Sequence, residues 1–340
     1  MIKRTQFHLL AAAVAALFCM FFCPFARGQS SPAQQKPWFE NITFKGYIQL
    51  DATFPQGNSV QGSVSNFRIR RTRPTFIVPI DALTRVQIQF DVSTGKCGSG
   101  ASTATVTDTY AERIVPHFGA IQFGQNLLPF ACEVYEDNAA LRSPLELSYA
   151  GEQLALLERD IGLFLRNTAS TEKCICWEFG LLNGQGFRSA DANANKTIAG
   201  RVTAPVLPWF RIGMSGLYGT YNNNGHDWDR HAAGWEFHVT ASKALKLSGE
   251  FYHAKFVDNP WAATKVARFD GGYLLSESWI GSLQSIPFVR YQRTYGDLDY
   301  RSVDLGWRWQ YASNQRLTAE YDIVNGHQRN YSGVRWQIFF

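Results

Sequence analysis

Long apolar segments are scarce in this sequence, and their scarcity limits how the chain can meet a membrane. A helix that spans a bilayer needs about 20 predominantly apolar residues, whereas the longest apolar stretch, residues 9–22, has 14. Charged residues are also few, at 18%, while hydrophobic residues make up 45%. These values exclude a polytopic helical membrane protein and a disordered chain.

Cysteine is scarce as well, with six residues in 340, which is too few for a disulfide framework. Cys97 and Cys132 could bridge two loops or remain as thiols, and the sequence leaves both alternatives open. Cys174 and Cys176 would share one face of a strand, but a metal site there would need two further ligands that the neighbouring sequence does not supply. We therefore expect no metal ion and no cofactor.

Residues 1–28 have the features of a cleaved signal peptide. Lys3 and Arg4 form a basic start, the apolar stretch follows, and Ala26 and Gly28 offer a cleavage point. A true membrane anchor is the alternative, although the stretch is short for one. Residues 29–40 then form a short polar tail, which we expect in the periplasm. Without the three basic residues of the leader the formal net charge falls from +5 to +2, so global charge identifies no partner.

From residue 41 onward the hydrophobic pattern has a period of two, which is the period of a β-strand. Val303, Leu305 and Trp307, for example, alternate with polar residues. The pattern predicts an all-β protein: a transmembrane antiparallel up-and-down β-barrel of sixteen strands over residues 41–340. The strand centres fall near residues 48, 71, 88, 109, 121, 164, 178, 201, 215, 236, 250, 271, 290, 307, 320 and 336.

Two all-β folds fit this alternation, and they differ in where the apolar face points. A soluble sandwich buries it in a core, whereas an outer-membrane barrel turns it toward lipid. The segments have about ten or more residues, with Tyr and Trp near their ends, which favours the barrel. A secreted all-β binding protein is the alternative. The residues that should be exposed in a barrel and buried in a soluble fold are Trp235, Phe237, Val239, Val303, Leu305, Trp307, Val334, Trp336 and Ile338.

The connections alternate between short and long, as they do in outer-membrane barrels with both chain ends in the periplasm. Short links lie at residues 79–83 and 115–118, for example, and longer polar links lie at residues 222–230 and, as a long third external loop, at 127–158. A ten-residue link at 276–285 stands where a short turn is expected, so fourteen strands are the alternative.

The C-terminal strand ends on an aromatic residue. Val334, Trp336, Ile338 and Phe340 alternate to the end of the chain. A terminal amphipathic strand of this kind is the signal by which the barrel-assembly machinery recognises outer-membrane proteins. We expect that machinery to be a partner through Phe340.

Four short segments are distinctive: FRIRRTRPTF at residues 67–76, GQNLLPF at 124–130, RDIG at 159–162 and FVRY at 288–291. Together they resemble the phosphate-selective porin O/P family, and the similarity covers roughly residues 44–340. The resemblance implies a homotrimeric, 16-stranded passive channel of the bacterial outer membrane for small hydrophilic solutes, with a preference for anions such as phosphate. It also implies an inward-folded third loop, arginine and lysine side chains that guide anions, and contact with lipid and lipopolysaccharide.

The alternation assigns many basic side chains to the inward, polar face, where Arg and Lys favour anions. They are Arg68, Arg166, Arg201, Arg211, Arg290, Arg308, Arg335, Lys45 and Lys246. Arg70, Arg71 and Arg73 lie where the alternation slips, so we expect a β-bulge near Arg70 or Arg71 that turns at least three arginines toward the pore. A basic rim that contacts lipopolysaccharide or only water is the alternative.

The acidic residues argue against a simple anion channel. The alternation sends eight carboxylates inward: Asp51, Asp91, Glu178, Glu236, Glu250, Asp304, Glu320 and Asp322. The third loop contains six acidic residues, among them Glu133, Glu136 and Asp137, against Arg142 alone. As a constriction it would repel phosphate unless the acids point into the barrel wall. A general, non-selective or cation-leaning porin is therefore a further alternative, with acids facing an arginine row.

Motifs of catalysis are missing. The sequence has no Walker loop, dinucleotide fingerprint or HExxH motif, so we expect no enzyme and no catalytic residue. His226, Asp227, Asp229 and His231 crowd one segment that we expect to be a solvated loop. Basic and aromatic residues alternate onto opposite faces, which disfavours a nucleic-acid partner.

Overall fold

The structure is a computed structural model. It describes residues 38–55, 65–94, 102–135, 159–167, 174–187, 189–191, 193–223, 225–240, 245–256, 264–273, 284–296, 300–325 and 331–340. The expected signal peptide, most of the polar tail, Cys97, Glu136, Asp137, Arg142 and the link at 276–283 lie outside these residues. Asn41–Phe340 forms one compact unit. Within the described ranges no helix has the length and apolar character to cross a membrane.

Sixteen strands and two short helices form from the described residues. The helices are η1 (Trp38–Asn41) and α2 (Cys132–Tyr135). The strands are β1 (Thr43–Pro55), β2 (Asn66–Pro79), β3 (Thr84–Thr94), β4 (Ser102–Val115), β5 (Gly119–Leu127), β6 (Arg159–Arg166), β7 (Cys176–Leu182), β8 (Thr197–Leu207), β9 (Phe210–Asn223), β10 (His226–Thr240), β11 (Leu245–Phe256), β12 (Thr264–Tyr273), β13 (Gln284–Gly296), β14 (Tyr300–Ala312), β15 (Gln315–Asn325) and β16 (Tyr331–Phe339).

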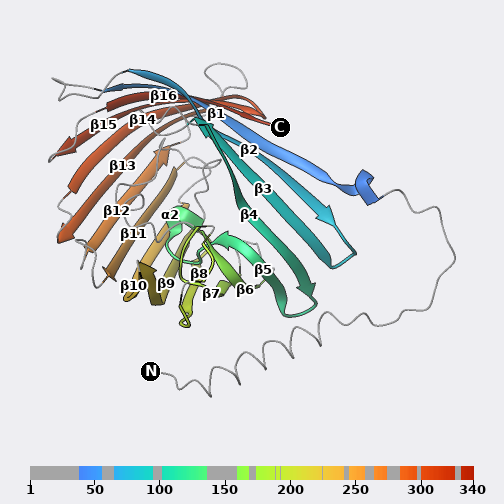
Figure 1. Ribbon diagram of the computed structural model, residues 1–340. Helices are drawn as coiled ribbons and strands as arrows, with labels where there is room; N and C mark the ends of the chain where they lie inside the picture. Colours follow the sequence, from blue (N-terminus) through green and yellow to red (C-terminus); the bar gives the residue numbers. More distant parts are fainter. Residues whose placement is uncertain are drawn as a thin grey trace, which may run out of the picture. The chain divides into compact units, whose positions relative to one another are not determined.

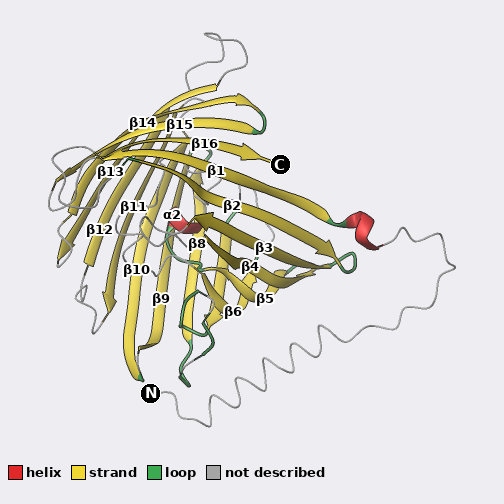
Figure 2. Cartoon of the chain, turned by 45° about the horizontal axis from the view of Figure 1, so that its top comes forward, coloured by secondary structure: helices red, strands yellow, loops and turns green. Residues whose placement is uncertain are grey.

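The strands form one closed antiparallel barrel. Each strand pairs with its neighbours in sequence, and β1 pairs with β16 from Tyr47 opposite Phe339 to Pro55 opposite Tyr331. Figures 1 and 2 show the first strand beside the last, with the other strands between them around the wall. Every predicted strand centre falls within one of these strands, so the sixteen-stranded barrel is confirmed and the fourteen-stranded alternative is wrong.

The two faces of the wall differ as the alternation predicts. Trp235 is 63% exposed on the outer face, and Leu305, Trp307 and Trp336 are exposed as well. Asp304 on the inner face is 0% exposed. The apolar face therefore points outward, and the alternative of a soluble fold that buries these aromatic residues is wrong.

The expected β-bulge lies in β2. Gln49 of β1 stands opposite Arg71, whereas Leu50 stands opposite Ile69, so Arg70 is the extra residue. Ile69 is exposed on the outer face, while Arg71 is buried. The bulge thus restores the alternation after one inserted residue, which confirms the prediction.

One predicted loop is wrong. The link at residues 222–230 was expected to be long and solvated, but β10 begins at His226 and pairs with β9 from His226 opposite Asn223 onward. The backbone of Gly225 has φ of 84°, and its N–H is bonded to Asn222 Oδ1 at 3.2 Å. A glycine in the left-handed region allows a tight hairpin here, and the cluster of His and Asp residues therefore belongs to a strand.

The turn between β2 and β3 is short, as predicted. The Asp81 carboxylate accepts hydrogen bonds from the backbone N–H groups of Leu83 (2.7 Å) and Thr84 (2.8 Å). The bond from Leu83 is the main reason why the pKa of Asp81 lies below its usual value. An aspartate at the first position of such a turn satisfies backbone donors that the strands leave unpaired.

The C-terminal residue closes the seam between β1 and β16. Gly46 and Phe340 exchange two backbone hydrogen bonds, at 2.7 and 3.0 Å. A Cβ atom on Gly46 would lie 2.5 Å from the Arg73 carbonyl oxygen and 2.8 Å from the Phe340 ring. Glycine is therefore required at this position for the terminal ring to pack against Phe44, whose ring centroid is 5.3 Å away.

We predict that Gly46→Ala weakens the closed barrel by about 1–3 kcal/mol, the usual cost of overpacking. The folded band on unheated gels should be lost at a lower temperature than in the unmodified protein. Gly216→Ala is the matched control, because its added Cβ would meet only the Ala232 carbonyl oxygen at 3.9 Å. Equal losses in the two variants would contradict the role of Gly46.

Candidate functional site: the inner wall and its inward-folded loop

The third long loop begins inside the barrel. After β5 the chain forms α2, which lies within the ring of strands in Figures 1 and 2. Leu128, Phe130 and Ala131 are buried against inward side chains of six consecutive strands, β6 to β11. We call this the apolar seat; it consists of Phe164, Leu182, Ala199, Leu217, Ala232, Tyr252 and Ala254. The ring of Phe130 meets that of Tyr252 edge to face, with centroids 5.9 Å apart, an arrangement that aromatic pairs favour.

Polar contacts fix the start of the loop at the same place. The Glu250 carboxylate on β11 accepts hydrogen bonds from the backbone N–H groups of Cys132 (2.9 Å) and Glu133 (3.3 Å). The Ser215 hydroxyl on β9 accepts one from the Ala131 N–H at 3.2 Å. Ala131 has φ of 61°, which is unfavourable for a residue with a Cβ and persists only where the surroundings impose it. The loop start is therefore held in one conformation by the wall.

Glu133, an expected constriction residue, points into the wall. Its side chain is 1% exposed and forms an ion pair with Arg290 on β13 at 3.8 Å. Arg290 also forms an ion pair with Asp304 on β14. Glu133 is therefore buried in the wall, where it shares the Arg290 guanidinium with Asp304, so this one acidic residue of the loop does not face the lumen.

An arginine row lines the inner wall on the side that carries β16, β1 and β2. It consists of Arg68, Arg71, Arg73 and Arg335. Arg335 donates two hydrogen bonds to Asp51, at 2.7 and 2.8 Å, and Arg68 lies 3.3 Å from the same carboxylate. Arg73 and Arg71 lie 2.6 and 4.0 Å from Asp91, and Arg71 also donates to Gln49 at 3.3 Å. Four guanidinium groups thus share two carboxylates.

Elsewhere the inward charges form ion pairs between strands. Buried charges are costly unless they are paired and hydrogen-bonded. The pairs are Arg166 and Arg85 with Glu112, Arg159 with Asp108, Arg230 with Asp160, and Arg201 with Glu236. Sequence reasoning did not select Arg85, Arg159 or Arg230, although Arg85 continues the same alternation as Gln87, Gln89 and Asp91.

The remaining selected basic residues are more accessible. Lys45 and Lys246 are exposed, and Arg308 and Arg211 are partly buried. Arg211 donates a hydrogen bond to the Thr203 hydroxyl at 2.6 Å. The selected bases are thus spread around the wall, and within the described residues several of them come together on β2 and β16, the two strands that flank β1.

One group of side chains that could serve as metal ligands contains a cysteine and a histidine. Cys132 of α2 lies beside Glu236 and His238 of β10, and their ligand atoms all lie within 4.8 Å of one another. Cys132 is present as a thiol. Its distance in sequence from β10 concealed this group from motif analysis.

Comparison with known proteins found neither a matching family model nor a matching curated protein. Solved structures do match. OmpF of Salmonella typhi in complex with daunomycin is 12% identical at a TM-score of 0.66, over 88% of this chain and 97% of that one. An anion-selective porin from Comamonas acidovorans is 11% identical at a TM-score of 0.65, over 88% and 99%. The in-vitro folded trimer form of OmpT from Vibrio cholerae is 14% identical at a TM-score of 0.58, over 88% and 99%.

The chain has the fold of the bacterial outer-membrane porins. At these identities the likeness concerns the fold. The likeness extends over nearly the whole length of each of these neighbours.

We predict that Glu250→Gln weakens the attachment of the loop start by about 1–3 kcal/mol. The Glu250 carboxylate accepts hydrogen bonds from the backbone N–H groups of Cys132 and Glu133, and an uncharged amide accepts such bonds less strongly. Hydrogen exchange at residues 131–133 should become faster. Glu320→Gln, the same chemical change on β15, is the control and should leave these amides protected. Unchanged exchange in Glu250→Gln would contradict the proposed anchoring.

Proposed function

We propose that this protein is a porin of the bacterial outer membrane, a passive channel for small hydrophilic solutes with a preference for anions such as phosphate. The proposal includes the export of residues 29–340 after removal of a signal peptide, with residues 29–40 as a periplasmic tail. It includes no catalytic step and no cofactor.

The outward apolar face supports the location. Trp235, Trp307 and Trp336 are exposed on a closed barrel, and large exposed apolar surfaces are unfavourable in water. A closed barrel leaves no strand edge with unpaired backbone groups, which is what lipid requires. Lipid and lipopolysaccharide are the environment that this surface fits.

The arginine row is the observation that carries the anion preference. Its four guanidinium groups lie beside the carboxylates of Asp51 and Asp91, so basic groups gather on this side of the wall. Arginine is charged at all physiological pH values and presents planar donors that suit phosphate oxygens. The burial of Glu133 in the wall beside Arg290 turns one acidic residue of the loop away from the path of anions. These features support the finer resemblance to the phosphate-selective porin O/P family.

A general, weakly selective or cation-leaning porin is the second candidate. Asp304, Glu320 and Asp322 gather on β14 and β15, with carboxylate oxygens within 4.8 Å of one another. This acidic patch lies on the strands next to the arginine row, so it would offset the positive charge there and admit cations as well as anions.

A homotrimer is part of the proposal, supported by the trimer form of the OmpT neighbour. Recognition by the barrel-assembly machinery is supported by the position of Phe340, which closes the seam with Gly46. Cross-linking in native membranes and gel migration without heating would test the trimer.

The deciding experiment measures reversal potentials in planar bilayers under a salt gradient, with chloride and with phosphate. We expect a mild anion preference that Arg71→Ala reduces. Two unit charges 4 Å apart interact by about 1 kcal/mol in water, so the anion-to-cation permeability ratio should fall by up to about fivefold.

Arg113→Ala is the matched control, because Arg113 lies at the turn end of β4 and forms an ion pair with the exposed Asp81. It should leave the reversal potential unchanged. A firmly cation-selective unmodified channel would refute the anion preference and favour the second candidate. Absence of stepwise conductance from correctly folded protein would refute the porin itself.

A further inference from the structure

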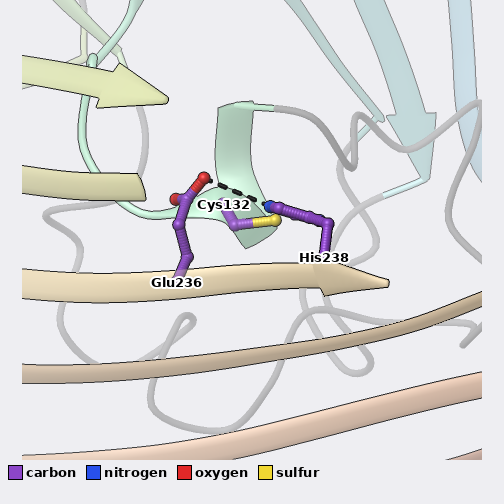
Figure 3. Close-up of side chains that lie close together, drawn as sticks. All are labelled: Cys132, Glu236 and His238. Carbon is purple, nitrogen blue, oxygen red and sulfur yellow. Dashed lines mark hydrogen bonds and ion pairs between the residues drawn. The ribbon is translucent and has the colours of Figure 1, made fainter. Parts of the chain in front are cut away.

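We propose that Cys132, Glu236 and His238 form a binding site for Zn²⁺ or a similar divalent transition metal, which ties the inward-folded loop to the barrel wall. Figure 3 shows the three side chains converging, with the Cys132 sulfur and the Glu236 carboxylate both directed toward the His238 ring nitrogen. Cys132 comes from α2, whereas Glu236 and His238 come from β10.

The geometry suits a tetrahedral ion. Glu236 and His238 are two residues apart on one strand, so both face inward, and Glu236 Oε1 lies 3.2 Å from His238 Nε2. Ligands at zinc-to-oxygen and zinc-to-nitrogen distances of about 2.0–2.1 Å and a tetrahedral angle lie roughly 3.3 Å apart. All three ligand atoms lie within 4.8 Å of one another, so binding requires shifts of about 1 Å or less at the side chains.

The donor set selects the class of metal. Thiolate and imidazole ligands favour zinc and related transition metals, whereas calcium and magnesium prefer sites built from oxygen alone. Three protein ligands leave a fourth position for water. The thiol of Cys132 loses its proton on binding, so the thiolate and the Glu236 carboxylate bring two negative charges to the ion, one of which Arg201 already offsets.

The surroundings support the ligands. Arg201 on β8 donates from Nε to Glu236 Oε2 at 3.0 Å and from Nη2 to Oε1 at 2.5 Å, so it orients the carboxylate through both oxygens, and Oε1 also lies beside His238. Hydrogen bonds of this kind to ligating groups are common and contribute to metal affinity. The Glu236 side chain is 2% exposed and that of His238 is 18% exposed. These two ligands are therefore largely shielded from water, and an ion would enter the site from the side of His238.

A bound ion would add a third anchor to the loop, beside the apolar seat and Glu250. The Glu250 carboxylate accepts the backbone N–H of Cys132 itself, so the wall already positions the residue that would supply the sulfur. Occupancy of the site should therefore slow hydrogen exchange at residues 131–133.

The test uses the full mature chain in detergent, stripped of metal with a chelator and kept reduced. Zn²⁺ is titrated by calorimetry, and Co²⁺ serves as a spectroscopic probe because thiolate ligation gives a sulfur-to-cobalt charge-transfer band. We expect one ion per chain and a thiolate band. Cys132→Ser and His238→Ala should each weaken Zn²⁺ binding by more than the roughly 10–100-fold that loss of an outer hydrogen-bond partner costs.

Cys176→Ser and His253→Ala are the matched controls, since they remove the same residue types from β7 and β11, and both should bind Zn²⁺ as the unmodified chain does. Migration on unheated gels confirms that each variant is folded. Binding that is equal in Cys132→Ser and the unmodified chain, or a cobalt complex without the thiolate band, would overturn the site. Because the assay needs no conductance, its failure is distinguishable from failure of the porin proposal.

Discussion

The constraint on which the rest of this structure depends is the pairing of every strand with two neighbours. Where water cannot reach the backbone, an unpaired N–H or C=O group is costly, and only a sheet that closes on itself leaves no edge. Closure here depends on β1 and β16, whose pairing runs from Tyr47 to Pro55 and ends in the two hydrogen bonds between Gly46 and Phe340. With the edge removed, the alternation of side chains alone decides what faces outward and what faces the interior.

The interior divides into two regions of different chemistry. Strands β6 to β11 present the small and apolar side chains that form the apolar seat, together with ion pairs such as Arg201 with Glu236 and Arg230 with Asp160. The wall from β13 through β16 to β4 presents charges paired between neighbouring strands, such as Arg290 with Asp304 and Arg335 with Asp51. The start of the loop covers the apolar seat, so the inner surface that it leaves uncovered is richer in charged side chains. Burial of the loop thus determines which part of the wall a solute can meet.

Much of the barrel could be predicted from sequence because a period of two is a local signal. The strand centres, the outward aromatic residues and the bulge at Arg70 all follow from counting residues. The hairpin at Gly225 was missed because the first residues of β10 are polar and resemble a loop in the sequence. The apolar seat was missed for another reason: Ala199, Ala232 and Ala254 are inward residues whose role appears only when Phe130, far away in sequence, packs against them.

The group of Cys132, Glu236 and His238 depends on the same long-range event. Glu236 and His238 share a face of β10 by their spacing, but the sulfur reaches them only because Glu250, Ser215 and the apolar seat hold the loop start against the wall. Energetic coupling between two sites is reciprocal. Anything that strengthens the contact between Cys132 and β10 therefore stabilises the inward position of the loop, and a loop released from its seat takes the sulfur away from Glu236 and His238. The loop position and the chemistry of this group are thus two consequences of one packing arrangement.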